Sequence, residues 1–554
     1  MNFLRFAAVA AAATFVGAAL PAVAGATDYC VYPNDGCGGT KVLKLQDALD
    51  QAASANDSDR IFLGADTYFP EPGHAGFVYS AKGAPVEIVG RGRGETVLTG
   101  REFALDRVLH LVGGPGSSVH DLTIEIPRNV DLGFKGLVTL NRAQRIEVTE
   151  DTVQANRHVG AWIVDDGLLE DSSVSLESAQ DTIGVIFGQA SQGTPTLRRS
   201  AVRAATGVRI AGPAAIERAR VMGANAAVVA AGKDITIRDS LLTINGSFGA
   251  VLRAETDING DTNVTADGVT IFGGNLPDIG GVAVNTNPEP SRSAHVTLAN
   301  SIVRGGLTSL SVVASGAGKG TISASYSDYD PSGNIAMGVS ASISESSVSN
   351  FGYAAHLSEV TGHEYALEPG SPLIDIGDPA AAQGLDLNGD PRVADGNADG
   401  VVRRDLGAFE LQPEPTAGEP AAGGGPAANT QAPLDTQAPL ISGFRPAPSV
   451  FAVARARSPL AARVARGTRL RYTLSENARV VLKIQRALGG RPMRYRTVGT
   501  LRRTGVGGLN RTRFTGRIGR RALRPGRYRA VITATDGAAN RSAPKTTRFR
   551  IARG

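Results

Sequence analysis

The feature that most constrains the fold of this chain is a six-residue pattern that recurs along its anterior part. The pattern reads apolar, two variable positions, a small residue, one variable position and apolar. Its clear copies begin at Leu169, Leu197, Ile216, Ile237 and Leu298, and weaker copies begin at Thr265 and Ile322. Successive copies lie 19 to 33 residues apart. Periods of about 20 to 50 residues are typical of stacked structural repeats.

Each repeat contains two or three short β-forming runs separated by Gly or Asn, such as residues 207–210 and 226–229. Runs of this length are too short for helical repeats. The chain also has 68 Gly and only 5% aromatic residues among its 554 positions, which favours turn-dense packing of small side chains over helical bundles. We therefore predict an all-β protein whose anterior part is a β-solenoid.

The chain ahead of the repeats begins with Cys30 and Cys37 and ends with two β-forming runs, residues 60–63 and 86–90. Between them lies an amphipathic stretch whose apolar face consists of Val42, Leu45, Leu49, Ala52 and Ala53. In this order, the segment resembles right-handed parallel β-helix proteins of the pectin-lyase-like class. The amphipathic stretch looks like the family's N-terminal capping helix, which can cover exposed apolar side chains and unpaired strand edges. We assign residues 27–411 to this domain.

Three segments close the same domain: residues 371–375 (Ser-Pro-Leu-Ile-Asp), 386–392 (Asp-Leu-Asn-Gly-Asp-Pro-Arg) and 405–410 (Asp-Leu-Gly-Ala-Phe-Glu). Together they resemble the closing signature of bacterial surface β-helix proteins of the choice-of-anchor kind. This signature implies no reaction.

The resemblance to pectin-lyase-like enzymes implies a polyuronide or other polysaccharide on one flank of the solenoid. The nearest match to a catalytic cluster is Asp165 and Asp166, preceded by Arg157 and His158. The hydrolases' Asn-Thr-Asp, Gly-His-Gly and Arg-Ile-Lys elements are missing, and a solvated turn explains the two aspartates better. We therefore expect a protein that binds extracellular polysaccharide or displays a surface without catalysis. The alternatives are a polysaccharide lyase or glycoside hydrolase and a stiff spacer without ligand.

A calcium site has a stronger basis in the sequence. Asp395, Asn397 and Asp399, followed by Gly400, match the first half of an EF-hand-type loop, in which oxygens at positions 1, 3 and 5 converge. Position 12 is Leu406 instead of Glu, and Asp405 stands one place early. We expect a surface loop that binds Ca²⁺ through Asp395, Asn397 and Asp399 and is completed by Asp405. An ordinary polar loop is the alternative.

Residues 1–26 are typical of a secretory signal peptide, with a positive start, an apolar run and a small-residue cleavage site. We expect a secreted or cell-envelope-associated monomer. No later segment approaches about 18 uninterrupted apolar residues, so no transmembrane segment is predicted. In an oxidising compartment Cys30 and Cys37 are expected to form a disulfide.

Charge divides the chain. Residues 440–554 contain 28 Lys and Arg against two acids, a net charge of +26, which leaves −21 for residues 1–439. Residues 412–439 are rich in Pro, Gly and Ala and are predicted to be a linker. Period-two alternation after residue 440 predicts a small antiparallel β-sandwich. The segment around Tyr528 resembles the tyrosine corner of bacterial immunoglobulin-like or fibronectin-III-like domains.

The arginines of this posterior domain favour a polyanionic partner. The candidates are a cell-wall polyanion, acidic polysaccharide, extracellular DNA and the acidic solenoid of the same chain, and codon-driven compositional drift is the alternative explanation. Few aromatic residues stand among the arginines, so specific nucleic-acid recognition is not expected.

Overall fold

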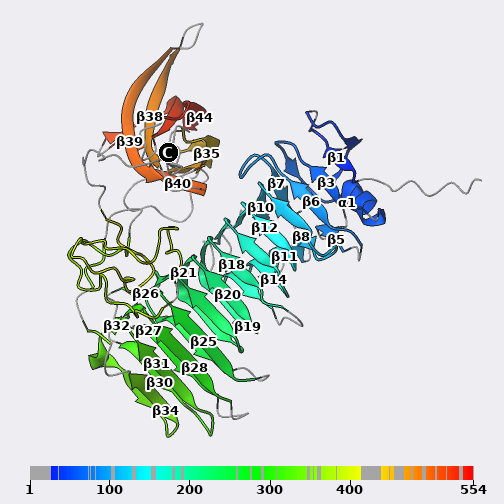
Figure 1. Ribbon diagram of the computed structural model, residues 1–554. Helices are drawn as coiled ribbons and strands as arrows, with labels where there is room; N and C mark the ends of the chain where they lie inside the picture. Colours follow the sequence, from blue (N-terminus) through cyan, green and yellow to red (C-terminus); the bar gives the residue numbers. More distant parts are fainter. Residues whose placement is uncertain are drawn as a thin grey trace, which may run out of the picture.

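A computed structural model describes residues 26–413 and 438–552, apart from short internal gaps (Figure 1). The longer gaps are 101–105, 128–132, 151–156, 177–180, 189–192, 257–259, 275–277, 288–291, 346–349, 359–363, 454–466, 490–493 and 536–540. Nearly all of the expected signal peptide, residues 1–26, and most of the predicted linker, residues 412–439, therefore lie outside the described residues.

Residues 28–345 coil into a right-handed parallel β-helix, drawn from blue to green in Figure 1. A typical coil adds one strand to a 14-stranded parallel sheet, sheet A, and two strands to a 20-stranded parallel sheet, sheet B. In spatial order, sheet A contains β2 (Thr40–Val42), β1 (Asp28–Val31), β3 (Asp59–Phe62), β6 (Val86–Val89), β9 (Ser118–His120), β12 (Arg142–Gln144), β15 (Leu168–Glu170), β18 (Thr196–Arg198), β20 (Ala214–Glu217), β22 (Ile235–Arg238), β25 (Thr262–Asp267), β28 (Ala294–Ala299), β31 (Gly320–Ser325) and β34 (Ala341–Glu345).

Sheet B takes the strands that follow each strand of sheet A along the chain. It contains β4 (Thr67–Tyr68), β5 (Phe77–Tyr79), β7 (Val97–Thr99), β8 (Arg107–Leu111), β10 (Thr123–Ile126), β11 (Lys135–Thr139), β13 (Glu147–Glu150), β14 (Val159–Ile163), β16 (Ser173–Ser175), β17 (Ile183–Phe187), β19 (Ala201–Ala211), β21 (Arg220–Ala231), β23 (Leu241–Ile244), β24 (Gly249–Glu255), β26 (Thr270–Phe272), β27 (Ile279–Asn285), β29 (Ile302–Arg304), β30 (Thr308–Val313), β32 (Asp328–Tyr329) and β33 (Ile335–Met337). A 3-10 turn, η1 (Pro331–Gly333), precedes β33.

The strand register confirms the repeat at its clearest copies. Leu169 pairs with Leu197, Leu197 with Ile216, and Ile216 with Ile237. The two weaker copies begin later than predicted. Ile237 pairs with Ala266 instead of Thr265. Likewise Leu298 pairs with Ala324, two residues beyond the predicted start at Ile322. In both coils the core position of the first apolar residue is occupied by alanine. Its small side chain gives only a weak apolar signal, so the sequence pattern does not identify it.

The small residue of the repeat occupies the tight turn between sheets A and B. Ser240 shows its role: its Oγ donates to the Arg238 carbonyl at 2.6 Å and accepts from the Ala219 N–H of the preceding coil at 3.1 Å. The residue before it, Asp239, has a φ of 48°. The same left-handed conformation recurs at Asp171, Arg199 and Arg218. A larger side chain at the serine position would displace these hydrogen bonds, which explains the pattern.

The apolar interior runs without a break from Tyr29 to Tyr329. Helix α1 (Leu45–Ser54) closes its N-terminal end with Leu45, Ala48, Leu49 and Ala52 buried. The capping helix is thus confirmed, although Ala53, which the sequence assigned to the apolar face, is exposed.

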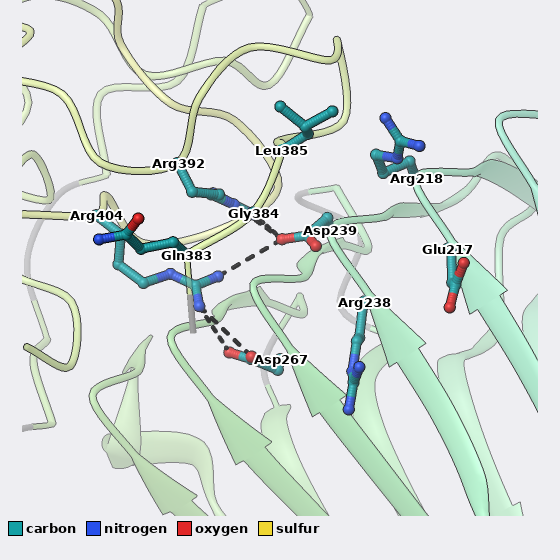
Figure 2. A pocket seen from close by; sticks show the side chains of 10 residues that line it. All are labelled: Glu217, Arg218, Arg238, Asp239, Asp267, Gln383, Gly384, Leu385, Arg392 and Arg404. Atoms are coloured by element: carbon teal, nitrogen blue, oxygen red, sulfur yellow. Dashed lines mark hydrogen bonds and ion pairs between the residues drawn. The ribbon is translucent and has the colours of Figure 1, made fainter. Parts of the chain in front are cut away.

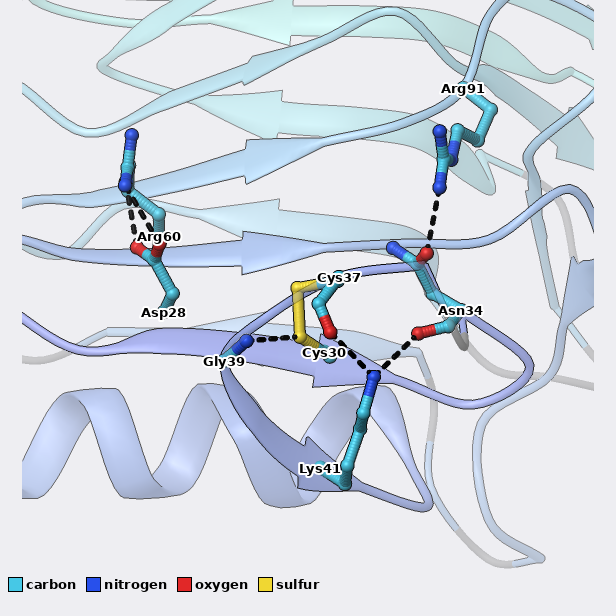
Figure 3. Close-up of a disulfide and its surroundings, with 8 residues drawn as sticks. All are labelled: Asp28, Cys30, Asn34, Cys37, Gly39, Lys41, Arg60 and Arg91. Carbon is cyan, nitrogen blue, oxygen red and sulfur yellow. Dashed lines mark hydrogen bonds and ion pairs between the residues drawn. A yellow bond between two sulfur atoms is a disulfide. The ribbon is translucent and has the colours of Figure 1, made fainter.

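The predicted disulfide between Cys30 and Cys37 is present beside this helix, with Cα atoms 5.7 Å apart (Figure 3). Lys41 braces the enclosed loop, because its Nζ donates to the carbonyls of Cys37 at 2.7 Å and Asn34 at 3.1 Å. The bridge therefore fixes the connection between β1 and β2 at the end of the solenoid.

After β34 the chain folds back as an irregular segment, residues 350–413, which we name the C-terminal strap. Figure 1 shows it in yellow-green beside β21, β26 and β32. Leu373 and Leu406 of the strap cluster with Ile302, and Ala408 and Phe409 cluster with Leu241. The strap therefore covers the outer side of sheet B, and it contains the three closing segments found in the sequence.

Residues 441–551 form separate, mainly antiparallel sheets with their own apolar cluster. The strands are β35 (Ile441–Ala447), β36 (Val450–Phe451), β37 (Thr468–Leu474), β38 (Ala478–Gly489), β39 (Arg494–Gly505), β40 (Gly508–Phe514), β41 (Arg517–Ile518), β42 (Arg521–Ala522), β43 (Gly526–Thr535) and β44 (Lys545–Ile551). The Tyr528 hydroxyl donates to the Arg524 carbonyl at 2.6 Å, as in a tyrosine corner. The immunoglobulin-like assignment stays a prediction. Among the described residues, no helix has the length and apolar character needed to cross a membrane.

Candidate functional site

The predicted catalytic residues lie at opposite ends of β14. Arg157 and His158 precede the strand, whereas Asp165 and Asp166 form the turn after it. Because a strand rises about 3.3 Å per residue, its five residues separate the two pairs by roughly 17 Å. The structure therefore does not assemble them into one centre.

The contacts of these four residues are typical of residues that support the fold. His158 is buried, with its Nδ1 3.3 Å from Glu150 Oε2. Arg157 is exposed and lies 3.5 Å from Asp181 Oδ2. Asp165 has a φ of 48°, and Asp166 Oδ1 accepts from the Thr194 N–H at 3.0 Å. Asp165 and Asp166 thus occupy a turn between strands of adjacent sheets.

A different set of charged side chains forms a continuous row on sheet A, which we name the charged row. Successive strands place Glu170, Arg198, Glu217, Arg238 and Asp267 opposite one another. Opposite charges on neighbouring strands stabilise a sheet. The ion pairs follow this order in part, since Arg198 contacts Glu170 at 3.6 Å and Glu217 at 2.9 Å.

His120 stands further toward the N-terminus in the same row. Its Nδ1 lies 2.8 Å from Asp121 Oδ2 and its Nε2 2.9 Å from Glu87 Oε1. Both ring nitrogens therefore face carboxylates. The hydrogen bond that the His120 ring makes to Asp121 raises the pKa of His120, burial opposes this, and Glu87 raises the pKa further.

The charged row ends in a cleft of about 350 Å³ between the solenoid and the C-terminal strap (Figure 2). The solenoid side consists of Glu217, Arg218, Arg238, Asp239 and Asp267. The strap contributes residues 383–385 together with Arg392 and Arg404. Four arginines and three carboxylates thus surround one opening, and its volume lies within the range of about 300 to 1,000 Å³ that is usual for ligand sites.

Two of the four arginines attach the strap to the solenoid. Arg392 is 1% exposed, and its Nε and Nη2 donate to Asp239 Oδ1 at 2.8 and 2.6 Å. Arg404 lies 3.5 Å from Asp239 and 3.4 Å from Asp267. Burial raises the pKa of Asp239 while Arg392 and Arg404 oppose that rise, and burial lowers the pKa of Arg404. Each aspartate of the cleft is therefore matched by strap arginine.

The other two arginines, Arg218 and Arg238, come from neighbouring coils of the solenoid. No ion pair within 4.0 Å joins either of them to a carboxylate among the described residues, and Figure 2 accordingly draws dashed lines only at Arg392 and Arg404. Arg238 is exposed and Arg218 is half-buried. The cleft thus offers two guanidinium groups to a ligand.

These cleft residues escaped the sequence analysis for a clear reason. Glu217, Arg218, Arg238 and Asp239 are the variable positions of the six-residue pattern, which was read only for its apolar and small positions. Their alternating charge was a signal that could have been used. Arg392 was not within reach of such reasoning, because it lies 153 residues from the aspartate that it contacts.

The predicted calcium residues are brought together only in part. Asp395, Asn397 and Asp399 share one loop, in which the Asp399 N–H donates to Asp395 Oδ1 at 3.0 Å and to Asn397 Oδ1 at 2.9 Å. Asp405 is not among the carboxylates that cluster at this loop. Its own carboxylate accepts from the N–H groups of Asp375 at 2.8 Å and Leu411 at 2.7 Å. Burial raises the pKa of Asp405 to about 7.

The carboxylate that does face the loop belongs to Asp375, which the sequence analysis did not select. Three carboxylate oxygens, one each from Asp375, Asp395 and Asp399, lie within 4.8 Å of one another. This group is the candidate metal centre. Asp375 stands 20 positions before the loop, so no local motif connects the two.

Comparison with known proteins adds little. No protein-family model and no curated protein matches the chain. Among solved structures, it is similar to the catalytic domain of a GH87 alpha-1,3-glucanase, an aspartate-to-alanine variant in complex with tetrasaccharides. That likeness has 13% sequence identity and a TM-score of 0.25, and covers 56% of this chain and 67% of the other. A likeness this weak contributes nothing to the argument about the site.

Proposed function

We propose that this protein is exported and binds an acidic extracellular polysaccharide in the cleft between the charged row and the C-terminal strap, without cleaving it. The observation that supports this proposal is the difference between the arginines of the cleft. Arg392 and Arg404 are ion-paired with aspartates, whereas Arg218 and Arg238 line the same opening without a carboxylate within 4.0 Å among the described residues.

A guanidinium group binds a carboxylate through two parallel hydrogen bonds, which makes arginine well suited to uronate groups. Arg218 and Arg238 belong to adjacent coils, because the Arg218 N–H donates to the Arg238 carbonyl at 3.0 Å. Neighbouring parallel strands lie about 4.8 Å apart, so the two side chains can contact acidic groups of one polymer chain. With four arginines against three carboxylates, the cleft also keeps an excess of positive charge.

The same geometry favours binding over cleavage. Glycoside hydrolysis uses one carboxyl group as a general acid and a second as a base or nucleophile. In the cleft, Asp239 and Asp267 are held by strap arginines, and Glu217 pairs with Arg198. Each of the three carboxylates is therefore engaged by an arginine, and they do not stand free as the pair of carboxyl groups that hydrolysis requires.

Calorimetry of the full chain with polygalacturonate or alginate, compared with a neutral glucan, tests this proposal. We expect R218Q/R238Q to weaken binding about tenfold or more, because each charge-assisted hydrogen bond contributes about 1.5 to 3 kcal/mol. Arg209, an exposed arginine of β19 outside the cleft, provides the matched control R209Q. Equal binding of the neutral glucan would refute the acidic ligand. Release of unsaturated sugar products would indicate a lyase, and release of new reducing ends would indicate a hydrolase; either result would refute binding without cleavage.

We further propose that residues 440–554 attach the protein to a cell-wall polyanion. Register in the posterior sheets sets Arg527 opposite Arg550 and Arg529 opposite Arg548. Like charges directly opposite one another destabilise a sheet unless counter-charge is supplied. The posterior part contains only Glu476 and Asp536 as acids, so most of the counter-charge for its arginines has to come from outside it. One such contact joins Arg445 to Glu125 of the solenoid at 3.8 Å.

Cell-wall sedimentation of the full chain tests the attachment. Binding is expected to weaken steeply between low and physiological salt, because exposed charges are screened over about 8 Å at physiological ionic strength. The variant R527Q/R529Q/R548Q/R550Q should bind less, while R218Q/R238Q should sediment like the wild type. Salt-independent binding would refute an electrostatic attachment.

A further inference from the structure

We infer that Asp375, Asp395 and Asp399 form a Ca²⁺ site that joins the loop 394–403 to an earlier turn of the C-terminal strap. The inference goes beyond the sequence motif, because it replaces Asp405 by a remote ligand. It does not depend on the polysaccharide proposal.

The loop itself positions several oxygen atoms. An isolated antiparallel bridge between Ala394 and Arg403 closes it. Inside the loop, the two oxygens of Asp395 accept from the N–H groups of Asp399 at 3.0 Å and Gly400 at 2.9 Å. Asp399 Oδ1 accepts from the Val401 N–H at 2.8 Å. These bonds hold the side chains in place, but taken alone they only describe a polar loop.

The independent observation is the state of Asp375. This residue is 4% exposed, and its Oδ2 is buried without a hydrogen-bond partner. Its Oδ1 accepts only a long hydrogen bond, 3.3 Å, from the Arg403 N–H. A buried carboxylate oxygen without a partner costs free energy unless a cation or donor compensates it. The carboxylate that carries this atom has an oxygen within 4.8 Å of oxygens of Asp395 and Asp399, so Asp375 belongs to the acidic group.

The local charges increase the need for a cation. The Arg403 guanidinium is engaged elsewhere, since its Nη2 donates to the carbonyls of Ile376 and Gly377. Three carboxylates thus converge with little positive charge between them. A divalent cation would reduce the repulsion between the three carboxylates and would also compensate the buried Asp375 Oδ2.

The donor set favours calcium over other metals. Every candidate ligand is oxygen, which excludes the nitrogen and sulfur environment that zinc prefers. Ca²⁺ accepts six to eight oxygens in flexible geometry, whereas Mg²⁺ demands a compact octahedron and keeps several waters. Asp395, Asn397 and Asp399 supply positions 1, 3 and 5 of the loop, and the carbonyl of Val401 stands at position 7. Asp375 takes the place of the position-12 glutamate that this loop lacks.

The experiment uses the full chain, stripped of metal with a chelator and titrated with Ca²⁺ alone. We expect one bound ion by calorimetry. The unfolding midpoint should rise by about 3 °C when free Ca²⁺ is a hundredfold above Kd. D375N should weaken Ca²⁺ binding about tenfold or more. Its metal-free midpoint should equal or exceed that of the wild type, because the substitution removes an uncompensated buried charge.

D378N is the matched control, because Asp378 lies in the same strap turn and its Oδ1 accepts from the Ala380 N–H. It should bind Ca²⁺ like the wild type. D399N changes an exposed ligand and should lose affinity as D375N does, which keeps the test decisive if D375N fails to fold. Wild-type affinity in D375N, absence of Ca²⁺ binding to the wild type, or an equal midpoint shift with Mg²⁺ would overturn the inference.

Discussion

Replacing Arg392 by methionine should release the C-terminal strap from the solenoid. The guanidinium group of Arg392 makes two hydrogen bonds to Asp239 Oδ1 and donates to the carbonyls of Gly407 at 2.8 Å and Gly268 at 3.2 Å. Methionine keeps much of the volume and removes all of these donors. The substitution therefore isolates the electrostatic contribution of the strap's central side chain.

The expected cost follows from the burial of the pair. Removing one partner of a buried ion pair costs about 3 to 5 kcal/mol, because the remaining charge is left without compensation. Arg404, 3.5 Å from Asp239, retains part of that compensation. The two carbonyls that lose a donor add to the cost. We therefore expect a loss of about 4 kcal/mol for R392M.

Two readouts separate local release from unfolding of the solenoid. Limited proteolysis in urea follows the opening of residues 371–411, whereas fluorescence of Trp162, the single tryptophan of the chain, follows the solenoid at β14. We expect cleavage of the strap at lower urea concentration while the fluorescence transition changes little. The double variant D239L/R392M should recover about 2 kcal/mol or more, because an apolar pair removes the isolated charge.

The result that would refute this reasoning is equally specific. If R392M opens the strap within about 1 kcal/mol of the wild type, the buried ion pair does not hold it. If D239L/R392M is no more stable than R392M, the cost comes from the lost carbonyl bonds and not from the uncompensated aspartate.

Three further outcomes follow from the described contacts. The substitution S240A should cost about 1 to 2 kcal/mol in urea unfolding followed by Trp162 fluorescence, since it removes one hydrogen bond within the turn and one buried hydrogen bond to the preceding coil. A neutral result would contradict the role of the small position. Replacing Cys30 and Cys37 by alanine should cost about 2 to 3 kcal/mol of stability by the loop-closure relation. Amide hydrogen exchange should then show weaker protection of β1 and β2 than in the wild type, and equal protection would contradict the prediction. The raised pKa of His120 means that its contribution to stability is complete below about pH 6.5 and is lost as pH rises through the folded-state pKa. The thermal unfolding midpoint should therefore fall more between pH 6 and pH 9 in the wild type than in H120Q. Parallel curves of midpoint against pH for the two proteins would exclude this contribution.

The sequence predicts the solenoid well because a repeated fold repeats its constraints. Leu169, Leu197, Ile216 and Ile237 fill the same core position in successive coils, and their spacing therefore equals the strand register. The prediction is wrong at Thr265, where an exposed polar residue precedes Ala266, the buried one. A small buried residue produces a weak apolar signal, and the register is then no longer defined by hydrophobicity.

The candidate sites were less accessible to sequence reasoning. The local part of the metal loop, Asp395 to Gly400, was found because its ligands are close in sequence. Asp375, the further ligand that we propose for this loop, lies 20 positions earlier, and the strap arginine Arg392 lies 153 positions from the aspartate that it contacts. Such contacts depend on tertiary packing, for which no spacing rule exists within a single sequence.

The most direct test of the account is hydrogen–deuterium exchange of the full chain with and without a defined oligogalacturonate. If the cleft binds acidic polysaccharide, amides of residues 214–218 and 235–239 and of the strap around 383–392 should gain protection, and R218Q/R238Q should lose that gain. Protection that appears only in residues 441–551, or only on strands of sheet B remote from the cleft, would contradict the assignment.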